Sequence, residues 1–311
     1  MQNITITLPD GSKREYAQGI TGLEIAASIG KRLAADSLAI RVNGKLKDVF
    51  VPINEDASIS IITWKDKEGI EVFRHSSAHL LAQAVLRLFP SAKPTIGPVV
   101  EEGFYYDFDF ERPFTPEDLL KIEEEMGKIV ESDFKVERHE LSKEDALKKF
   151  AHNPYKVELI NEFNEPSSAY SQGEFLDLCR GPHIPRTGLI KGFKLLKVAG
   201  AYWRGDAKNK QLQRIYGISF PEKKVLDAHL KLLEEAKKRD HREIGKRLDL
   251  FSFDEVSPGA PFIHPKGVTI FNELVTFIRG EYKKRGYKEV ITPLVYDKSL
   301  WETSGHWEHY H

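Results

Sequence analysis

The sequence contains only one cysteine, Cys179, in 311 residues. A single thiol cannot form an intramolecular disulfide, which fits a reducing compartment. The chain also lacks any run of about 18 apolar residues, so no membrane-spanning helix is predicted. Its start, MQNITITLPDG, alternates apolar and polar residues and lacks the basic and apolar regions of a secretory signal. We therefore expect a cytoplasmic protein without a membrane partner.

The sequence also has no large excess of charge of either sign, because it contains 46 Lys and Arg residues and 47 Asp and Glu residues. A nucleic-acid partner would then depend on local clusters of basic residues. Acidic residues prevail between positions 101 and 145, and basic residues prevail between 186 and 214. We expect this second stretch to bind phosphates, although solvated surface charge is the alternative for each of its residues: Lys191, Lys194, Lys197, Arg204, Lys208, Lys210 and Arg214.

The length predicts two or three domains, because single hydrophobic cores stop growing before this size. Residues 4–8, 38–42 and 57–63 have the pattern of strands, and residues 21–33 have the pattern of a short helix. These elements form a small β-α-β module. The charged stretch 64–69 has no hydrophobic period and is interpreted as a linker to the next domain.

Three helices are predicted in the second domain. Residues 74–89 carry apolar side chains at helical spacing until Pro90. A second helix starts at Thr115, which forms a capping box with Asp118, and a third starts at Ser142. Strands and Gly-rich turns prevail from 168 to 218, so the domain is of the α+β class.

The remaining residues predict the start of a third unit. Residues 222–248 have one apolar stripe and are interpreted as a long helix that bridges two domains. A helix over 267–285 and a strand over 287–293 follow. No capping signal precedes His311, and we expect this unit to be incomplete.

Two short motifs carry chemically reactive side chains. His75 and His79 are four residues apart on a predicted helix, so their imidazoles lie on one face. Cys179 and His183 are four apart across a Gly-Pro turn. Together the four side chains could bind zinc as a tetrahedral set, or could line a hydrolytic pocket in which an imidazole takes a proton from water. Spacing alone leaves both alternatives open.

The pair HSSAH and DLCRGPH resembles the editing domain of threonyl-tRNA synthetases, and alanyl-tRNA synthetases have a related signature. Five further strings resemble the threonyl family only: GFYYDFD at 103–109, AGAYWRGD at 199–206, QLQRIYG at 211–217, RDHREIGKRLDLF at 239–251 and WETSGHWEHY at 301–310. The resemblance therefore extends along nearly the whole chain.

The resemblance implies an α+β multidomain protein. Residues 1–62 would form a TGS domain, a ubiquitin-like β-grasp, and residues 64–240 the editing domain. Residues 241–311 would form the end of a linker helix and the truncated start of a class II catalytic domain, whose first motif belongs to a homodimer interface. The full-length family uses ATP, Mg and one zinc ion in the catalytic domain, which we expect to be missing from this chain.

For the editing domain, the resemblance implies hydrolysis of seryl-tRNA(Thr) without a cofactor, in support of threonylation of tRNA(Thr). The catalytic residues would be His75, His79, Lys156, Asp177, Cys179 and His183. Arg180, Gly181 and Pro182 would contact substrate, together with one of Tyr105 and Tyr106. Cys179 would act as a pocket wall or a ligand rather than as a nucleophile. No metal is expected at the editing site, and zinc on His75, His79, Cys179 and His183 is the minority alternative.

Two other functions stay open for this chain. It could be a tRNA-binding module without independent activity, or a structural zinc-binding domain. The first module could be a tRNA-facing accessory or a spacer, and its balanced charges do not decide between these roles.

Overall fold

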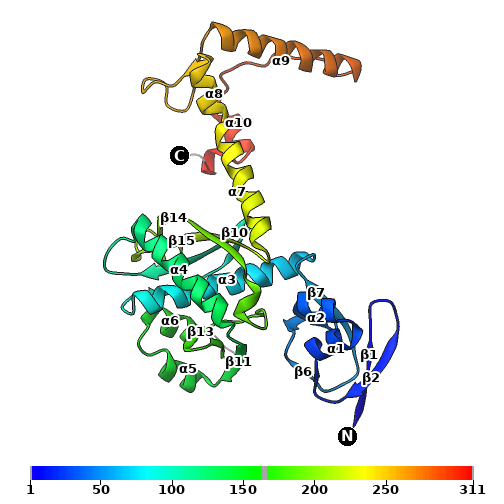
Figure 1. Cartoon of the computed structure of the whole chain (residues 1–311). Helices are drawn as coiled ribbons and strands as arrows, with labels where there is room; N and C mark the ends of the chain where they lie inside the picture. Colours follow the sequence, from blue (N-terminus) through cyan, green and yellow to red (C-terminus); the bar gives the residue numbers. More distant parts are fainter. Residues whose placement is uncertain (1, 163–166, 310–311) are drawn as a thin grey trace. The chain divides into compact units, whose positions relative to one another are not determined.

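The structure, a computed structural model, describes residues 2–162 and 167–309 (Figure 1). Tyr310, the last residue of the 301–310 string, lies outside the described residues. The chain forms two compact units, Met1–Lys231 and Leu232–His311, which are described separately. The first unit contains both the predicted β-α-β module and the domain with the histidine motifs.

The first module is a five-stranded mixed sheet in the order β2-β1-β7-β4-β5, with β1 and β7 parallel, as in a β-grasp. The short pair β3-β6 and two helices complete it. The three predicted strands are confirmed, and β2 and β5 add to them. The elements are β1 (Asn3–Thr7), β2 (Lys13–Ala17), β3 (Ile20–Thr21), α1 (Gly22–Ile29), α2 (Lys31–Asp36), β4 (Ser37–Val42), β5 (Lys45–Asp48), β6 (Pro52–Ile53) and β7 (Ala57–Thr63).

Local sequence explains most of these boundaries. Thr21 caps α1 through a capping box with Glu24. The helix predicted over 21–33 is interrupted at Gly30, whose extended backbone separates α1 from α2. Ile6 and Ile25 are fully buried and belong to one core cluster, which fixes α1 on the sheet.

The interpretation of 64–69 as a linker is wrong for its second half, because residues 64–66 form a turn but residues 67–69 are helical. Helix α3 (Lys67–Leu88) begins within it, and Gly69 lies so close to the first module that a Cβ there would approach the Thr63 carbonyl oxygen to 1.9 Å. The Trp64 and Phe73 rings pack edge-to-face with centroids 4.6 Å apart. Lys67 and Glu68 are therefore in the first turn of a long helix, and only the turn 64–66 separates this helix from the module.

The second domain has two antiparallel sheets. The larger has the order β14-β15-β10-β8, with β9 also paired to β10, and the smaller has the order β11-β12-β13. Its strands are β8 (Lys93–Pro94), β9 (Val99–Val100), β10 (Gly103–Asp109), β11 (Val136–Leu141), β12 (Ser167–Gln172), β13 (Phe175–Leu178), β14 (Gly192–Tyr202) and β15 (Gln211–Phe220). Its helices are α4 (Pro116–Ser132), α5 (Lys143–Lys149) and α6 (Pro154–Glu162), with 3-10 turns η1 (Thr187–Leu189) and η2 (Trp203–Gly205).

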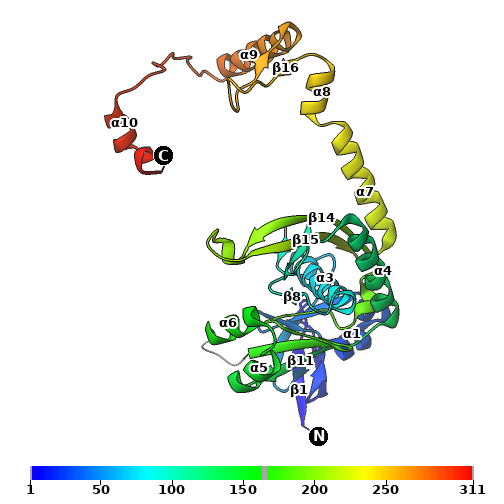
Figure 2. The same cartoon turned by 90° about the vertical axis from the view of Figure 1, so that its left-hand side faces the viewer.

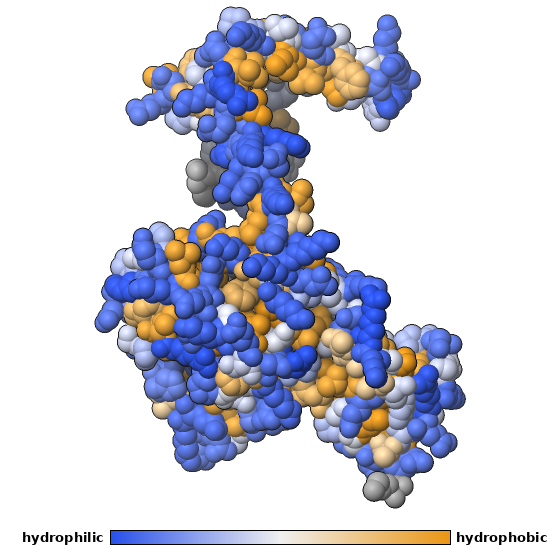
Figure 3. All heavy atoms as spheres, in the orientation of Figure 1, coloured by the Kyte–Doolittle hydropathy of each residue, from blue (hydrophilic) through white to orange (hydrophobic). Residues whose placement is uncertain are grey.

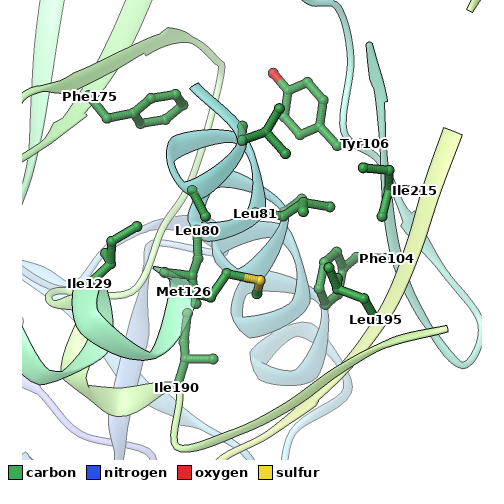
Figure 4. Close-up of a cluster of buried hydrophobic side chains, with 14 of the residues drawn as sticks. Leu80, Leu81, Phe104, Tyr106, Met126, Ile129, Phe175, Ile190, Leu195 and Ile215 are labelled. Carbon is green, nitrogen blue, oxygen red and sulfur yellow. The ribbon is translucent and has the colours of Figure 1, made fainter. Parts of the chain in front are cut away.

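Helix α3 lies at the centre of this domain, against β10 and β15 on one side and α4 on the other (Figure 2). Figure 4 shows Leu80 and Leu81 of α3 among side chains from α4 and the sheet, and all of them belong to one buried cluster. Both leucines are fully buried, and so are Met126 of α4 and Phe104 of β10. Because most of α3 is buried, its packing determines the direction in which His75 and His79 point.

The predicted starts of α4 and α5 are confirmed. Thr115 accepts from the Asp118 N–H and Pro116 occupies the first helical turn of α4, while Ser142 accepts from the Asp145 N–H at the start of α5. In both cases a hydroxyl satisfies a backbone donor that the helix leaves unpaired.

The region from 222 to 311 differs from its prediction in two places. The long helix expected over 222–248 is divided into α7 (Lys223–Lys238) and α8 (His241–Arg247), because Asp240 has an extended backbone and caps α8. The strand expected over 287–293 is absent among the described residues. The helix expected over 267–285 is confirmed as α9 (Pro265–Lys284). The remaining elements are β16 (Phe251–Ser252), β17 (Phe262–Ile263), α10 (Lys298–Thr303) and α11 (His306–His309).

Apolar side chains remain exposed along α9, as Figure 3 shows. Leu274 and Phe277 are 60% and 63% exposed. None of the helices in the described part of the chain combines the length and the apolar character needed to cross a bilayer.

Candidate active site

Helix α3 presents His75 and His79 one turn apart on the face that turns toward the smaller sheet. His79 is buried, whereas His75 is half-buried at the edge of a cavity. Their rings meet edge-to-face with centroids 5.4 Å apart. Ser76 and Ser77, between them, each donate to a carbonyl of the preceding turn, so the segment remains helical.

The second motif begins at the end of β13 and continues into a turn. Asp177 is in β13, and Cys179 extends the pairing with β12 through a backbone bond of 3.1 Å to the Ser168 carbonyl. The Ser168 hydroxyl donates in return to the Cys179 carbonyl at 2.6 Å. The peptide bond between Gly181 and Pro182 is cis. The turn then brings His183 back to α3.

The two motifs converge on one point. Cys179 Sγ lies 3.3 Å from His75 Nε2 and 3.2 Å from His183 Nε2. The ring centroid of His183 lies 4.4 Å from that of His75 and 4.2 Å from that of His79. The four potential ligand atoms of these residues all lie within 4.8 Å of one another.

Ser76 contacts the ring of His183. The Ser76 hydroxyl donates to the Val72 carbonyl at 2.9 Å, so toward its other neighbours it is an acceptor. It accepts from the Ile184 N–H at 3.0 Å, and His183 Nδ1 lies 3.0 Å away. With the Ser76 proton on the Val72 carbonyl, His183 donates from Nδ1 and directs the lone pair of Nε2 at the Cys179 thiol.

A second polar group lies beside the histidines and is buried. Lys156 of α6 is 2% exposed, and its Nζ forms an ion pair of 2.6 Å with Asp177. Tyr106 of β10 donates to the other oxygen of Asp177 and accepts from Lys156 Nζ at 3.2 Å. His79 Nε2 lies 3.7 Å from Asp177. The carboxylate thus joins the lysine, the tyrosine and a histidine.

Only one of the two predicted tyrosines reaches the cavity. Alternate residues of a strand face opposite sides, so Tyr106 turns inward, and Tyr105 does not line the cavity. Tyr105 instead packs on Tyr216 and under Arg214, whose guanidinium lies 3.7 Å from the ring centroid.

Burial determines the protonation of these groups. It lowers the pKa of His75 to about 4 and that of His79 to about 3, and it lowers the pKa of His183 well below its usual value. It raises the pKa of the Cys179 thiol to about 12. Burial also opposes ionisation of Asp177, but Lys156 and His79 outweigh it and lower the pKa of that carboxyl. At neutral pH the site holds neutral imidazoles, a thiol and one ion pair.

His75, His79 and Cys179 line a cavity of about 960 Å³, together with Lys156, Asp177, residues 95–98, Arg138 and Ser168, whereas His183 lies behind this wall and does not line the cavity. Gly97 is required there, because a Cβ would lie 2.4 Å from the Tyr106 ring. Of the predicted contact residues, Arg180 lines this cavity, whereas Gly181 and Pro182 line a neighbouring cavity that shares His75 and Pro98.

The predicted phosphate-binding stretch does not form a uniform basic surface. Four of its residues are in ion pairs: Lys194 with Glu123, Arg204 with Glu158 and Glu162, Lys210 with Asp109, and Arg214 with Asp107. Lys191, Lys197 and Lys208 are exposed and form no ion pair within the described residues. These three are the lysines of the stretch that remain available to a phosphate.

Sequence reasoning missed three residues that hold the site together: Ser76, Tyr170 and Asp48. Ser76 lies inside the HSSAH motif, and a hydrogen-bonding role could have been suspected from its place between the histidines. Tyr170 and Asp48 carry no local signal, because they reach the turn only through the packing of separate elements.

Two family profiles match the chain. The "TGS domain" matches residues 4–63, and the "Threonyl and Alanyl tRNA synthetase second additional domain" matches residues 168–216. The second range contains Cys179 and His183, but it does not include α3, the helix of the other two histidines.

Curated relatives match almost the whole chain. Threonine–tRNA ligases of Desulforamulus reducens, Caldanaerobacter subterraneus and Carboxydothermus hydrogenoformans are 57%, 56% and 54% identical to it, each over 99% of this chain. The matches cover 49%, 48% and 49% of those proteins, so the chain spans about half the length of the curated relatives it matches. The chain therefore contains the TGS domain and the editing-type second additional domain of threonyl-tRNA synthetases, and it is related to them over 99% of its length.

Proposed function

We propose that this chain hydrolyses tRNA(Thr) that carries serine by mistake. The proposal is carried by one cavity lined by two neutral histidines, His75 and His79, by the Cys179 thiol and by the buried Lys156–Asp177 pair, with His183 behind the thiol. The match to a second additional domain of threonyl and alanyl synthetases supports tRNA as the substrate class.

The reaction is the hydrolysis of an ester. Water attacks the seryl carbonyl and loses a proton, the bond to the ribose oxygen breaks, and that oxygen takes up a proton. Serine and tRNA with a free terminal hydroxyl are released. A neutral imidazole can accept and return these protons, and burial keeps His75 and His79 neutral down to about pH 4.

Lys156 is suited to the charge that develops on the carbonyl oxygen. An ammonium group has three N–H donors, and two of them are directed at Asp177 and Tyr106. The third is available to a ligand in the cavity that Lys156 lines. A donor held in place before the reaction stabilises the transition state without reorganisation.

Cys179 acts in this proposal as a wall of the pocket. Because its pKa is raised to about 12, almost none of it is thiolate at neutral pH, and the thiolate is the nucleophilic form. The thiol has one proton for two imidazole nitrogens at 3.2 and 3.3 Å, and so it links His183 to His75.

The need for such a reaction follows from the difference between serine and threonine. One methyl group changes binding by about 1–3 kcal/mol, which is too little for accurate charging. We propose that the cavity admits seryl esters and rejects threonyl esters at that methyl, so that correctly charged tRNA survives.

Within a longer protein, this activity would support the charging of tRNA(Thr) with threonine. That reaction would use ATP, Mg²⁺ and a zinc ion, and the hydrolysis proposed for this chain uses none of the three. The exposed apolar face of α9 supports a homodimer of the class II type. Lys191, Lys197 and Lys208 are the proposed contacts to tRNA phosphates.

The test is release of labelled serine from Ser-tRNA(Thr) by the full chain, beside Thr-tRNA(Thr) and beside a His75→Ala, His79→Ala double variant. We expect the parent to release serine faster than threonine and the double variant to lose at least about 100-fold. A folded parent that binds Ser-tRNA(Thr) without releasing serine would leave a tRNA-binding module as the function.

A zinc site is the second candidate, because four ligand atoms lie within 4.8 Å of one another. The donor set fits zinc, and a Ser76 contact at His183 Nδ1 would orient the ring with Nε2 toward a metal. His75, His79, Cys179 and His183 would hold the ion. Metal analysis of the purified chain and its unfolding in a chelator distinguish a structural ion from a metal-independent site.

A further inference from the structure

Asp48, the last residue of β5, belongs to the TGS domain but contacts the active-site turn. Its side chain is completely buried. Asp48 Oδ1 accepts from the backbone N–H of His183 at 2.7 Å, and Oδ2 accepts from the Tyr170 hydroxyl at 2.8 Å. Both carboxylate oxygens are therefore used on residues more than 120 positions away in the sequence.

Tyr170 packs against the turn that contains Gly181 and His183. Its ring centroid lies 4.4 Å from that of His183, and a Cβ on Gly181 would lie 1.9 Å from its hydroxyl oxygen. The charged group that faces the pair is Arg138 of β11, whose Nη1 lies 3.8 Å from Asp48 Oδ2 and 3.4 Å from the Tyr170 hydroxyl. Arg138 is also a wall of the active-site cavity.

A carboxylate in this position is expensive for the fold. Transfer of an ionised group out of water costs several kcal/mol unless it is paired, and an apolar residue of similar size is often the more stable choice. Here the carboxylate does what an apolar residue could not do, because it satisfies the buried N–H of His183 and the phenol of Tyr170.

We propose that Asp48 is a positioning residue of the editing site, and that the TGS domain thereby completes that site. His183 is held at two points: Asp48 binds its backbone N–H, and Ser76 of α3 binds its Nδ1. Its Nε2 is consequently fixed against Cys179 at 3.2 Å. Without Asp48, the His183 ring would keep its contact with Ser76 of α3, but the backbone N–H of His183 would lose its hydrogen bond.

This inference rests on the proposed editing activity, and it assigns the TGS domain a role beyond that of a tRNA-facing accessory or a spacer. The core supports the coupling, because Leu38 and Ile62 of that domain are buried in one cluster with residues of α3. The two domains thus share a core beside the contact that Asp48 makes.

The test compares Asp48→Ala and Asp48→Asn in the full chain with Asp56→Asn. Asp56 is a matched control, because it is an exposed carboxylate of the same domain that accepts from a backbone N–H, that of Thr5. The readouts are kcat and KM for serine release from Ser-tRNA(Thr), and hydrogen exchange of the His183 amide.

For Asp48→Ala we expect kcat to fall about 100-fold, as for a misplacement of about 1 Å, with KM within twofold of the parent. Asp48→Asn keeps an oxygen that can accept from the His183 N–H, so it should retain more activity than Asp48→Ala. Asp56→Asn should match the parent. The His183 amide should exchange at least tenfold faster in Asp48→Ala, while amides of the α3 core keep their rates.

An Asp48→Ala chain that is folded and retains the parent kcat would overturn the proposal, as would an unchanged exchange rate at His183. If Asp48→Ala does not fold, Asp48→Asn decides: loss of kcat without a change in KM supports positioning, and unchanged kcat overturns it. If the parent itself releases no serine, the proposed function fails. The exchange rate of the His183 amide then still tests whether Asp48 holds the backbone of the turn.

Discussion

At the scale of single residues, the candidate active site is a set of groups kept uncharged by burial around one ion pair. Three histidines are neutral, Cys179 is a thiol, and the charges of Lys156 and Asp177 compensate each other at 2.6 Å. The motifs HSSAH and DLCRGPH predicted the convergence of His75, His79, Cys179 and His183. They did not predict Asp48, because its partner lies 135 residues away and no spacing rule connects strand ends of different domains.

Burial of His79 should make the protein less stable in mild acid. Its pKa is lowered from 6.5 to about 3, so between pH 6.5 and 4 the unfolded chain binds a proton that the folded chain does not. The free energy of unfolding therefore falls as pH drops through this window. A His79→Gln variant should lose part of that slope, up to about 1.4 kcal/mol per pH unit, in chemical denaturation at several pH values.

The control for this measurement is His152→Gln, at an exposed position, which should keep the slope of the parent. A parent and a His79→Gln variant with the same dependence on pH would show that His79 is protonated in the folded state.

Gly181 should not tolerate a side chain. Its φ is +70°, and a Cβ would lie 1.9 Å from the Tyr170 hydroxyl oxygen. Gly181→Ala should cost at least about 2 kcal/mol in the free energy of unfolding and reduce serine release about 100-fold. Gly205→Ala is the matched control, because its φ is +72° but nothing lies within 4 Å of its Cβ. Equal effects of the two variants would trace the loss to backbone strain rather than to contact with Tyr170.

At the scale of elements, local signals succeeded where a boundary depends on a few adjacent residues. The starts of α4 and α5 followed from Thr115 and Ser142 because a cap is a local interaction. The linker expected over 64–69 was wrong because exposed charges in the first turn of α3 hide the packing of Gly69 and Trp64. Lys156 was predicted as catalytic only by resemblance, since its burial depends on Asp177 of a distant strand.

Gly69 provides a test of the junction between β7 and α3. In Gly69→Ala the new methyl group would lie 1.9 Å from the Thr63 carbonyl oxygen, so the helix start must move away from the sheet. We expect a loss of about 2–4 kcal/mol in the free energy of unfolding, measured by chemical denaturation. Gly127→Ala, inside α4 and with open space at its Cβ, should instead be neutral or stabilising by up to about 1 kcal/mol. A Gly69→Ala chain as stable as the parent would mean that a loose linker is the better description.

At the scale of the whole molecule, the two units differ in how far they bury their apolar side chains. The unit Met1–Lys231 buries its apolar side chains in several clusters and contains the cavity of about 960 Å³. The unit Leu232–His311 leaves large apolar side chains in solvent, among them Leu274 at 60% and Phe277 at 63%. The strand expected over 287–293 has no partner strand within the described residues, and a strand is stable only when its backbone groups are paired.

An exposed apolar face of this size should associate with a second copy of the chain. We expect the chain to sediment as a dimer at micromolar concentration and Phe277→Glu to sediment as a monomer. Thr276→Glu introduces the same charge at the neighbouring exposed position and should remain dimeric. A parent that is monomeric at all concentrations would contradict the proposed role of α9.

We propose that the cavity around Cys179 hydrolyses seryl-tRNA(Thr) with its own side chains. The most direct measurement is single-turnover release of labelled serine by the metal-stripped chain, with its metal content determined in the same sample. We predict that release continues at the rate of untreated protein and disappears in the His75→Ala, His79→Ala double variant. Serine release that stops on metal removal and returns with zinc would contradict the account and assign the four residues to a metal centre.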